Sequence, residues 1–459
     1  MTKQKISPIS SSFRDPSGFL FERSGVLYRQ VNNSYKSHYD QLISSELYKK
    51  LVDNGLLISH KEVSPEISPQ KAYKVLQPDP IPFISYPYEW SFSQLKDAAI
   101  TTLKIQGIAL DHGMVLKDAS AYNIQFVGSR PILIDTLSFE KYHEGEAWVG
   151  YKQFCQHFLA PLLLMKYKDL RLGLTSQLFI DGIPLDYASK LLPISTYIKP
   201  LALLHIHMHS RSQKAFESKK VKLGEYRVQK EAIVRMAKSL EQSILKLTLP
   251  VQHTVWGNYY DDTNYSHKAF REKKSLVQEM LKSIKPKKVW DIGANTGEFS
   301  RLAAQLGAYT VASDIDALAV ERNYLQTKAA NETNLLPLII DLTNPSPSLG
   351  WENMERASYL SRGPADVVMA LALVHHLAIG NNVPFIKIAE MLSRMGKYAI
   401  VEYVPKSDSN AIRLLQSRKD IFDGYTESGF EKSFSLYFSI VTRASIAGSK
   451  RVLYLLKKK

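Results

Sequence analysis

Several residues in the second half of the sequence have the types and spacing of a nucleoside-binding site. The run VWDIGANTGE places Asp291 directly before a turn that contains Gly293, Asn295 and Gly297. Glycine permits backbone angles that are closed to other residues, so a ligand can approach the main chain of such a turn. Asp314 ends the next apolar run, seventeen residues after Gly297. A carboxylate in that place can accept hydrogen bonds from both hydroxyls of a ribose.

Two later runs continue this pattern. The run LPLIID ends at Asp341, whose carboxylate can contact an adenine amino group, and the run DVVMAL ends at Leu371. An NAD site requires G-x-G-x-x-G, because the pyrophosphate must lie against the backbone at a helix N-terminus. Here Gly293 is followed by Ala294 and Asn295, without the second glycine. The turn therefore favours S-adenosylmethionine, which has no phosphate, over NAD.

The elements that must position these residues alternate between strands and helices. Short apolar runs are followed by amphipathic runs of helical length, and such alternation predicts a doubly wound α/β domain with a parallel sheet. The expected strands are 288–292, 309–313, 336–340, 366–371 and 398–404. The expected helices are 273–284, 298–306, 317–330 and 384–395. A final antiparallel hairpin is expected over 436–443 and 451–456.

Residues 251–459 resemble the class I S-adenosylmethionine-dependent methyltransferase superfamily, whose seven-stranded sheet ends in such a hairpin. The segments LALVHHL and VEYVP are similar to a bacterial two-domain subgroup in which some members carry nodulation-protein names. The resemblance implies that the glycine turn holds the cofactor, the second strand binds its ribose, the third its adenine, and the fourth lines its back. The cofactor-binding residues that it implies are Asp291, Gly293, Asn295, Gly297, Asp314, Asp341, Ala370 and Leu371.

Three further residues are candidates for a catalytic base. Methyl transfer needs an acceptor atom aligned with the S–CH₃ bond in a pocket that excludes water, and some acceptors must also lose a proton. His375 and His376 follow the fourth expected strand, and Glu402 lies near the end of the fifth, so each could take that proton. The alternative for each is a structural role in packing or capping. Aromatic residues before the domain could cover the cofactor or simply pack: Trp256, Tyr259 and Tyr265.

A second set of polar residues lies in the first half of the chain. Asp118 and Asn123 have the D-x-x-x-x-N spacing of a protein-kinase catalytic loop, in which the aspartate orients the hydroxyl and the asparagine binds a metal. Asp135 follows the apolar run PILI and stands where the metal-binding aspartate of D-F-G would be. The region resembles a kinase-like or aminoglycoside-phosphotransferase-like fold. The resemblance implies an ATP site with Mg²⁺ at Asn123 and Asp135.

The first half departs from the kinase pattern at three places. It has no G-x-G-x-x-G loop, Arg29 stands where the nucleotide lysine is expected, and Thr136-Leu137 replaces the Phe-Gly of D-F-G. These departures favour an inert or ligand-binding scaffold over a working phosphotransferase.

Composition limits the class of protein. The chain has 459 residues, of which 45% are hydrophobic, and this indicates a folded protein with two domains. The single cysteine, Cys155, can form neither an internal disulfide nor a cysteine-based zinc site, which favours a reducing cytoplasm. The N-terminus has no secretory apolar region, and no apolar run is long enough for membrane insertion. No metal site is expected in the second domain.

The net charge of +15 raises the possibility of a nucleic-acid partner. Residues 210–285 carry 16 Lys and Arg against 8 Asp and Glu, so much of the excess is concentrated there. Such a basic connecting segment is more typical of a solvated linker and helix face than of a nucleic-acid surface. Nucleic acid is therefore the less favoured partner.

These observations predict three segments. Residues 1–209 form an α+β kinase-like domain that is degenerate, 210–250 a basic linker and helix, and 251–459 the methyltransferase domain. The predicted function is methyl transfer from S-adenosylmethionine to an acceptor of unidentified class, with the first domain recognising the substrate or a nucleotide. The alternatives are a bifunctional phosphotransferase–methyltransferase, and a non-catalytic protein that binds S-adenosylmethionine or a nucleotide.

Overall fold

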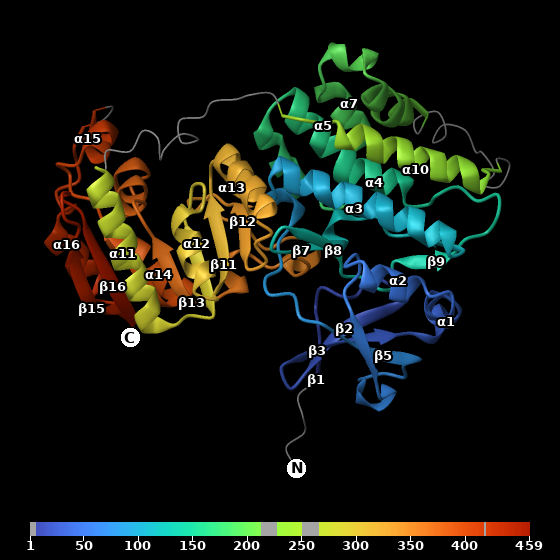
Figure 1. Ribbon diagram of the computed structural model, residues 1–459, viewed down its shortest axis with the longest axis horizontal. Helices are drawn as coiled ribbons and strands as arrows, with labels where there is room; N and C mark the ends of the chain where they lie inside the picture. Colours follow the sequence, from blue (N-terminus) through green and yellow to red (C-terminus); the bar gives the residue numbers. More distant parts are fainter. Residues whose placement is uncertain (1–5, 213–226, 250–265, 417–418) are drawn as a thin grey trace. The chain divides into compact units, whose positions relative to one another are not determined.

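The computed structural model describes residues 6–212, 227–249, 266–416 and 419–459, and it divides the chain into two compact units (Figure 1). Unit 1 comprises Met1–Pro250 together with Ser348–Arg356, and unit 2 comprises Val251–Pro347 together with Ala357–Lys459. The short segment Ser348–Arg356 therefore interrupts unit 2 along the chain, although its contacts place it in unit 1.

Unit 2 contains a seven-stranded sheet in the order β12-β11-β10-β13-β14-β16-β15 (Figure 1). Its strands are β10 (Lys288–Ile292), β11 (Tyr309–Asp314), β12 (Leu335–Ile339), β13 (Ala365–Ala370), β14 (Gly396–Tyr403), β15 (Phe438–Ser445) and β16 (Val452–Lys458). The first five in this order are parallel, whereas β16 runs antiparallel to both β14 and β15. The predicted doubly wound sheet with a terminal antiparallel hairpin is confirmed.

Helices cover both faces of this sheet. They are α11 (His267–Ile284), α12 (Glu298–Gln305), α13 (Ala317–Ala329), α14 (Phe385–Met395), α15 (Ser409–Leu415) and α16 (Glu427–Phe434). On β16, Leu453 and Leu455 pack in a buried cluster with Val277 of α11. Tyr454 lies between them, and its ring contacts Phe430 of α16. Because neighbouring side chains of a strand point to opposite faces, α11 and α16 lie on opposite sides of the sheet.

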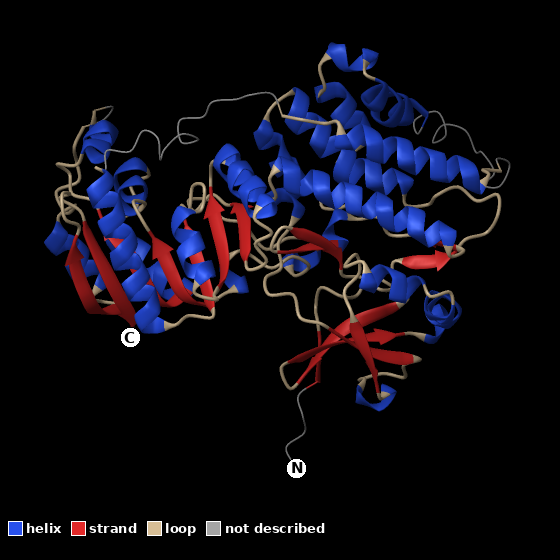
Figure 2. Cartoon of the chain, in the orientation of Figure 1, coloured by secondary structure: helices blue, strands red, loops and turns tan. Residues whose placement is uncertain are grey.

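Unit 1 begins with an antiparallel sheet in the order β1-β2-β3-β5-β4 (Figure 2). Its strands are β1 (Ile6–Pro8), β2 (Gly18–Arg23), β3 (Val26–Val31), β4 (His60–Val63) and β5 (Lys74–Pro78), with helices α1 (Lys36–Ser44) and α2 (Leu47–Asp53) between β3 and β4. Helices α1 and α2 are separate elements because Glu46, directly before α2, adopts a left-handed backbone conformation (φ 62°).

The rest of unit 1 is mainly helical. Its helices are α3 (Phe92–Asp111), α4 (Tyr151–Phe154), α5 (Ala160–Tyr167), α6 (Thr175–Leu178), α7 (Leu185–Leu191), α8 (Pro200–Ala202) and α10 (Lys230–Leu245). Two small pairs of antiparallel strands lie between α3 and α4: β6 (Met114–Leu116) pairs with β9 (Phe139–Lys141), and β7 (Ile124–Val127) pairs with β8 (Arg130–Leu133). The helix predicted within residues 210–250 is α10, which packs along α3. Lys96 of α3 donates hydrogen bonds to the carbonyls of Leu245 and Leu247.

Residues 151–167 form one helical run made of three parts. A π-helical turn at Cys155–Leu159 joins α4 to α5, and Pro161 is the second residue of α5, immediately after this turn. A π-helical turn is one way for a helix to accommodate a local irregularity such as proline. Among the helices that the structure describes, none has the length and apolar character needed to cross a bilayer.

Candidate functional site

The turn after β10 is shaped by glycine. Gly293 and Gly297 have positive φ angles of 75° and 82°, a conformation that residues with a Cβ rarely adopt. A Cβ on Gly297 would lie 2.6 Å from the buried amide group of Asn323. The backbone N–H of Gly293 donates to the carbonyl of Ser313 at 2.8 Å. The chain can therefore fold tightly from the end of β10 into α12 while its backbone stays accessible.

Two more carboxylates lie at the ends of the neighbouring strands. Asp314 ends β11 and accepts hydrogen bonds from the backbone N–H groups of Asn295 and Asp316, at 2.8 and 2.9 Å. Asp341 follows β12 and accepts from the backbone and hydroxyl of Thr343, at 2.8 and 2.6 Å. Since β10, β11 and β12 are adjacent and parallel, Asp314 and Asp341 lie at the same edge of the sheet as Asp291.

A cavity of about 250 Å³ lies at this edge. The strand order reverses between β10 and β13, and ligands of doubly wound sheets bind in the crevice at that reversal. Two predicted residues lie behind the cavity wall rather than in it: Gly297 shapes the turn, and Ala370 is buried in β13. The other predicted residues line it: Asp291, Gly293, Asn295, Asp314, Asp341 and Leu371.

Burial changes the acidity of two of these carboxyl groups. Burial raises the pKa of Asp291 to about 7, although the Ser300 hydroxyl donates to its carboxylate at 2.6 Å. Burial likewise raises the pKa of Asp314 to about 6, against the opposing effect of the backbone N–H groups of Asp316 and Asn295. Both carboxyl groups are therefore weaker acids than an exposed aspartate.

The two histidines after β13 have different surroundings. His376 lines the cavity, and burial lowers its pKa to about 4, so the ring is neutral near pH 7. His375 is 0% exposed, and neither of its ring nitrogens has a hydrogen-bond partner among the described residues. The rings lie 4.1 Å apart, measured between centroids. The geometry offers His376 to a ligand, and His375 packs behind it.

Glu402 is fully buried on β14 and does not line the cavity. Its carboxylate lies 2.6 Å from the ammonium of Lys273 and 3.3 Å from the guanidinium of Arg451. Arg451 also contacts Asp408, at 2.7 Å. A carboxylate held between two buried cations suits a structural role better than proton transfer to a ligand.

Lys273 is a cavity residue that was not among the residues predicted from the sequence. It lies on α11, four residues before Val277 and eight before Leu281, both of which are buried. A lysine at these positions falls on the apolar stripe of the helix, and this was the available signal. Three aromatic residues proposed to cover the cofactor, Trp256, Tyr259 and Tyr265, lie outside the described residues.

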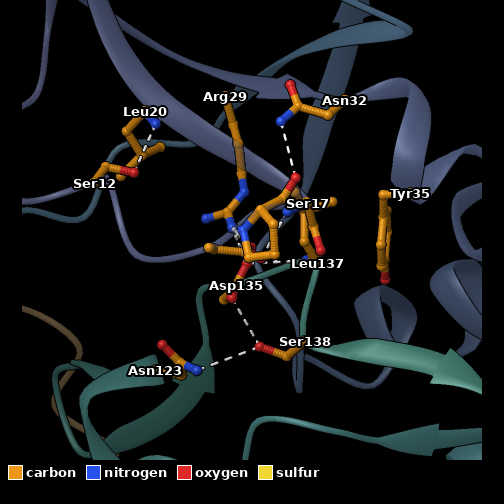
Figure 3. Close-up of polar contacts among 12 residues, drawn as sticks. Ser12, Ser17, Leu20, Arg29, Asn32, Tyr35, Asn123, Asp135, Leu137 and Ser138 are labelled. Atoms are coloured by element: carbon orange, nitrogen blue, oxygen red, sulfur yellow. Dashed lines mark hydrogen bonds and ion pairs between the residues drawn. The ribbon is translucent and has the colours of Figure 1, made fainter.

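In unit 1, neighbouring side chains hold the three polar residues of the kinase-like pattern, and Figure 3 shows two of them, Asn123 and Asp135. The amide of Asn123 donates to the Ser138 hydroxyl at 3.3 Å, and that hydroxyl donates to Asp135 at 2.9 Å. The guanidinium of Arg29, from β3, lies 2.8 Å from the other oxygen of Asp135. Asp118 instead accepts a hydrogen bond from Gln153, at 2.8 Å.

These contacts occupy the oxygen atoms that the predicted Mg²⁺ and ATP site would use. Both oxygens of Asp135 already accept hydrogen bonds or an ion pair, and Asn123 points its amide at Ser138 rather than at Asp135. In the described part of the chain, no group of three or more histidine, cysteine or acidic side chains could hold a metal ion. The arrangement does not support a metal-bound nucleotide at these residues.

Comparisons with known proteins identify several similar chains. No family model matches the sequence. The N-methyltransferase NodS from Bradyrhizobium japonicum WM9 is 13% identical, with a TM-score of 0.33, over 42% of this chain and 98% of that structure. Magnesium protoporphyrin IX methyltransferase (ChlM) from Synechocystis PCC 6803 is 17% identical, with a TM-score of 0.32, over 44% and 92% of the two chains. The bifunctional kinase–methyltransferase WbdD is 15% identical, with a TM-score of 0.31, over 47% and 45%.

A curated relative matches nearly the whole sequence. Nodulation protein NoeA of Rhizobium meliloti (strain 1021) is 36% identical over 455 residues, which cover 97% of this chain and 95% of the relative. The matched residues therefore extend over both units. The chain belongs to the family of nodulation protein NoeA.

Proposed function

We propose that unit 2 is an S-adenosylmethionine-dependent methyltransferase. The observation that carries this proposal is the convergence of three strand-end carboxylates, Asp291, Asp314 and Asp341, on one cavity beside a glycine turn. Asp314 is suited to accept hydrogen bonds from ribose hydroxyls, and Asp341 from an adenine amino group. The turn offers backbone rather than the G-x-G-x-x-G phosphate cradle of a dinucleotide site.

The chain's own residues would position the reactants. Bound in the cavity, the cofactor would supply an electrophilic methyl group, and apolar residues such as Phe299 and Leu377 would exclude water from it. His376 lines the same cavity and is neutral near pH 7, so it can accept a proton from an acceptor group. His375 and Glu402 act as positioning residues in this scheme.

Unit 1 is proposed to recognise the acceptor rather than to transfer a phosphoryl group. The ion pair between Arg29 and Asp135 uses the carboxylate that a metal–nucleotide complex would need. Added ATP with Mg²⁺ is therefore expected to leave the melting temperature of the protein unchanged. A melting temperature that rises with ATP only when Mg²⁺ is present would favour the bifunctional alternative instead.

The cofactor site is tested by isothermal titration of the full-length protein with S-adenosylhomocysteine. We expect saturable binding, and a loss of about tenfold or more in affinity for Asp314→Asn, because a charge-assisted hydrogen bond contributes about 1.5–3 kcal/mol. The matched control is Asp366→Asn. Asp366 lies at the opposite end of β13 from the cavity, where its carboxylate contacts Lys397 at 2.9 Å. Absence of binding to the folded wild-type protein would overturn the proposal.

A further inference from the structure

Unit 1 exposes several apolar side chains on two helical elements that follow each other closely in the chain. One element is the 3₁₀-helix η7 (Ile194–Ile198), and the other is the π-helical segment η8 (Leu203–Met208). Single exposed apolar residues are normal on a protein surface, whereas a group of them marks an interaction site. Four side chains, which we call the apolar patch, are between 48% and 87% exposed: Ile194, Ile198, Leu204 and Met208.

The two elements are held together around one buried histidine. His207 belongs to η8 and is 1% exposed. Its Nδ1 lies 2.7 Å from the hydroxyl of Ser189, on α7, and its Nε2 lies 2.9 Å from the hydroxyl of Thr196, on η7. The ring of Tyr197 stacks on the same imidazole, with the two centroids 3.8 Å apart. The polar groups of this region therefore point inward, and the apolar patch lies on adjoining elements of a fixed structure.

The charged residues along this stretch of the chain are all basic. Residues 187–212 contain Lys190, Lys199 and Arg211, and they contain no aspartate or glutamate. Both lysines are exposed, and they flank η7: Lys190 lies in the last turn of α7, and Lys199 follows Ile198 directly. Exposed cations on either side of exposed alkyl groups complement a partner that is both anionic and apolar.

An anionic lipid surface fits these features better than a folded protein does. Protein interfaces are centred on aromatic and arginine side chains, which here contact each other: Tyr197 stacks on His207, and the guanidinium of Arg211 lies 5.6 Å from the centre of the Tyr197 ring. The apolar patch offers flexible alkyl groups instead. Such groups enter the boundary between lipid headgroups and acyl chains, while lysines keep their ammonium groups at the level of the phosphates.

We propose that the apolar patch, with Lys190 and Lys199 beside it, docks unit 1 on the surface of an anionic lipid membrane. The alkyl groups supply the apolar contact, and the two lysines supply the attraction to lipid phosphates. The patch lies in the interface of the bilayer and does not cross it. This role belongs to unit 1 and is independent of the cofactor site in unit 2.

The test is sedimentation of the full-length protein with lipid vesicles. Vesicles of phosphatidylcholine with about one third phosphatidylglycerol should bind the protein, and vesicles of phosphatidylcholine alone should bind it at least about tenfold more weakly. Ile194→Ser/Ile198→Ser should weaken binding to the anionic vesicles by about tenfold or more, because both apolar contacts are lost. Lys190→Gln/Lys199→Gln should also weaken it by about tenfold or more, because each lysine near the surface contributes about fivefold.

Two double variants are the matched controls. Ile421→Ser/Leu436→Ser removes two apolar side chains of unit 2 that are 63% and 61% exposed. Lys49→Gln/Lys50→Gln removes two exposed lysines of α2. Both controls should bind the anionic vesicles as wild type does. Because all four variants change exposed side chains only, each should keep the wild-type melting temperature, which confirms that it is folded.

The isoleucine variant decides the outcome. The net charge of +15 would by itself attract the protein to anionic vesicles, and this variant keeps every charge. Undiminished binding by Ile194→Ser/Ile198→Ser, or an equal loss in the matched controls, would overturn the proposal. So would a wild-type protein that ignores anionic vesicles. If wild type self-associates in sedimentation velocity without binding vesicles, and the isoleucine variant is monomeric, the patch joins two copies of the chain and the membrane assignment is wrong.

Discussion

Arg29 and Asp135 form an ion pair inside unit 1, with their nearest atoms 2.8 Å apart and both side chains 13% exposed. Arg29 belongs to β3 of the five-stranded sheet, whereas Asp135 follows β8, more than one hundred residues later in the chain (Figure 3). Asp15 lies 3.2 Å from the same guanidinium. One arginine thus joins the N-terminal sheet to the segment that follows β8.

The first prediction concerns the stability of this pair. Arg29→Met leaves Asp135 largely buried without its cation, and we expect the free energy of unfolding to fall by about 1–3 kcal/mol in urea titrations. The control is Arg171→Met, whose partner Asp169 lies at the surface and whose own side chain is 83% exposed. That variant should unfold at the wild-type urea concentration. Equal behaviour of the two variants would mean that Arg29 does not stabilise unit 1.

The second prediction concerns the pH dependence of cofactor binding. Burial raises the pKa of Asp314 to about 6, and ribose hydroxyls donate to its ionised form. Affinity for S-adenosylhomocysteine should therefore be full above pH 7 and fall as the pH drops through 6, by about tenfold at pH 5. Titration calorimetry between pH 5 and 8 measures this change. Asp314→Asn should remove the step near pH 6, and a flat profile in wild type would contradict the assigned role.

The third prediction concerns Asp291 and the stability of the ligand-free protein. Burial raises its pKa in the folded state to about 7, whereas the pKa of an aspartate in an unfolded chain is about 3.9. The folded state therefore binds more protons between these values, so stability decreases as pH rises from about 4 to 7. The substitution Asp291→Asn removes this decrease in stability, and the amide oxygen of the new side chain can still accept the hydrogen bond from Ser300. It should be more stable than wild type at pH 8, by up to a few kcal/mol.

Urea unfolding at pH 4.5 and pH 8 measures this effect, and Asp366→Asn is its contrast. Despite partial burial of the group, contacts with Lys397 and with the backbone of Lys287 and Lys288 lower the pKa of Asp366. The ionised carboxylate of Asp366 stabilises the folded protein at neutral pH, and this stabilisation is lost in acid. The variant Asp366→Asn should therefore be less stable than wild type at pH 8. If Asp291→Asn behaves like Asp366→Asn at both pH values, the inferred protonation of Asp291 is wrong.

The fourth prediction separates backbone strain from steric overlap in the glycine turn. Gly297 and Gly307 both have positive φ angles, 82° and 90°. A Cβ on Gly297 would meet Asn323 at 2.6 Å, whereas a Cβ on Gly307 would have nothing within 4 Å. Gly307→Ala should cost about 1 kcal/mol, and Gly297→Ala about 2–4 kcal/mol, in urea unfolding. Similar losses in the two variants would show that close packing around the turn is unimportant.

The alternation of apolar and amphipathic runs was sufficient to predict the sheet of unit 2, because each βα repeat is local in sequence. The carboxylates at the strand ends could be predicted for the same reason: Asp314 and Asp341 each follow directly from a recognisable strand. Parallel strands then bring these ends to one edge. Local sequence was therefore sufficient to predict the carboxylates that line the cavity at β11 and β12.

The other side of the cavity depends on contacts between distant residues. Glu402 was predicted as a possible base because it lies near the end of a strand, but its environment is set by Lys273 and Arg451, which are far from it in the sequence. The pairing of Arg29 with Asp135 is equally nonlocal. Sequence spacing identified Asp135 as a residue of interest, and it could not identify the arginine that neutralises it.

The segment Ser348–Arg356 determines how this protein can be cut into fragments. Glu355 in this segment lies 2.7 Å from Arg14, and both residues belong to unit 1. A fragment that begins after residue 250 would therefore carry nine residues of the missing half, with Glu355 deprived of its arginine. The chain passes from unit 1 to unit 2, back to unit 1 at Ser348, and again to unit 2 at Ala357. A C-terminal fragment designed to stand alone should therefore have a short linker in place of Ser348–Arg356.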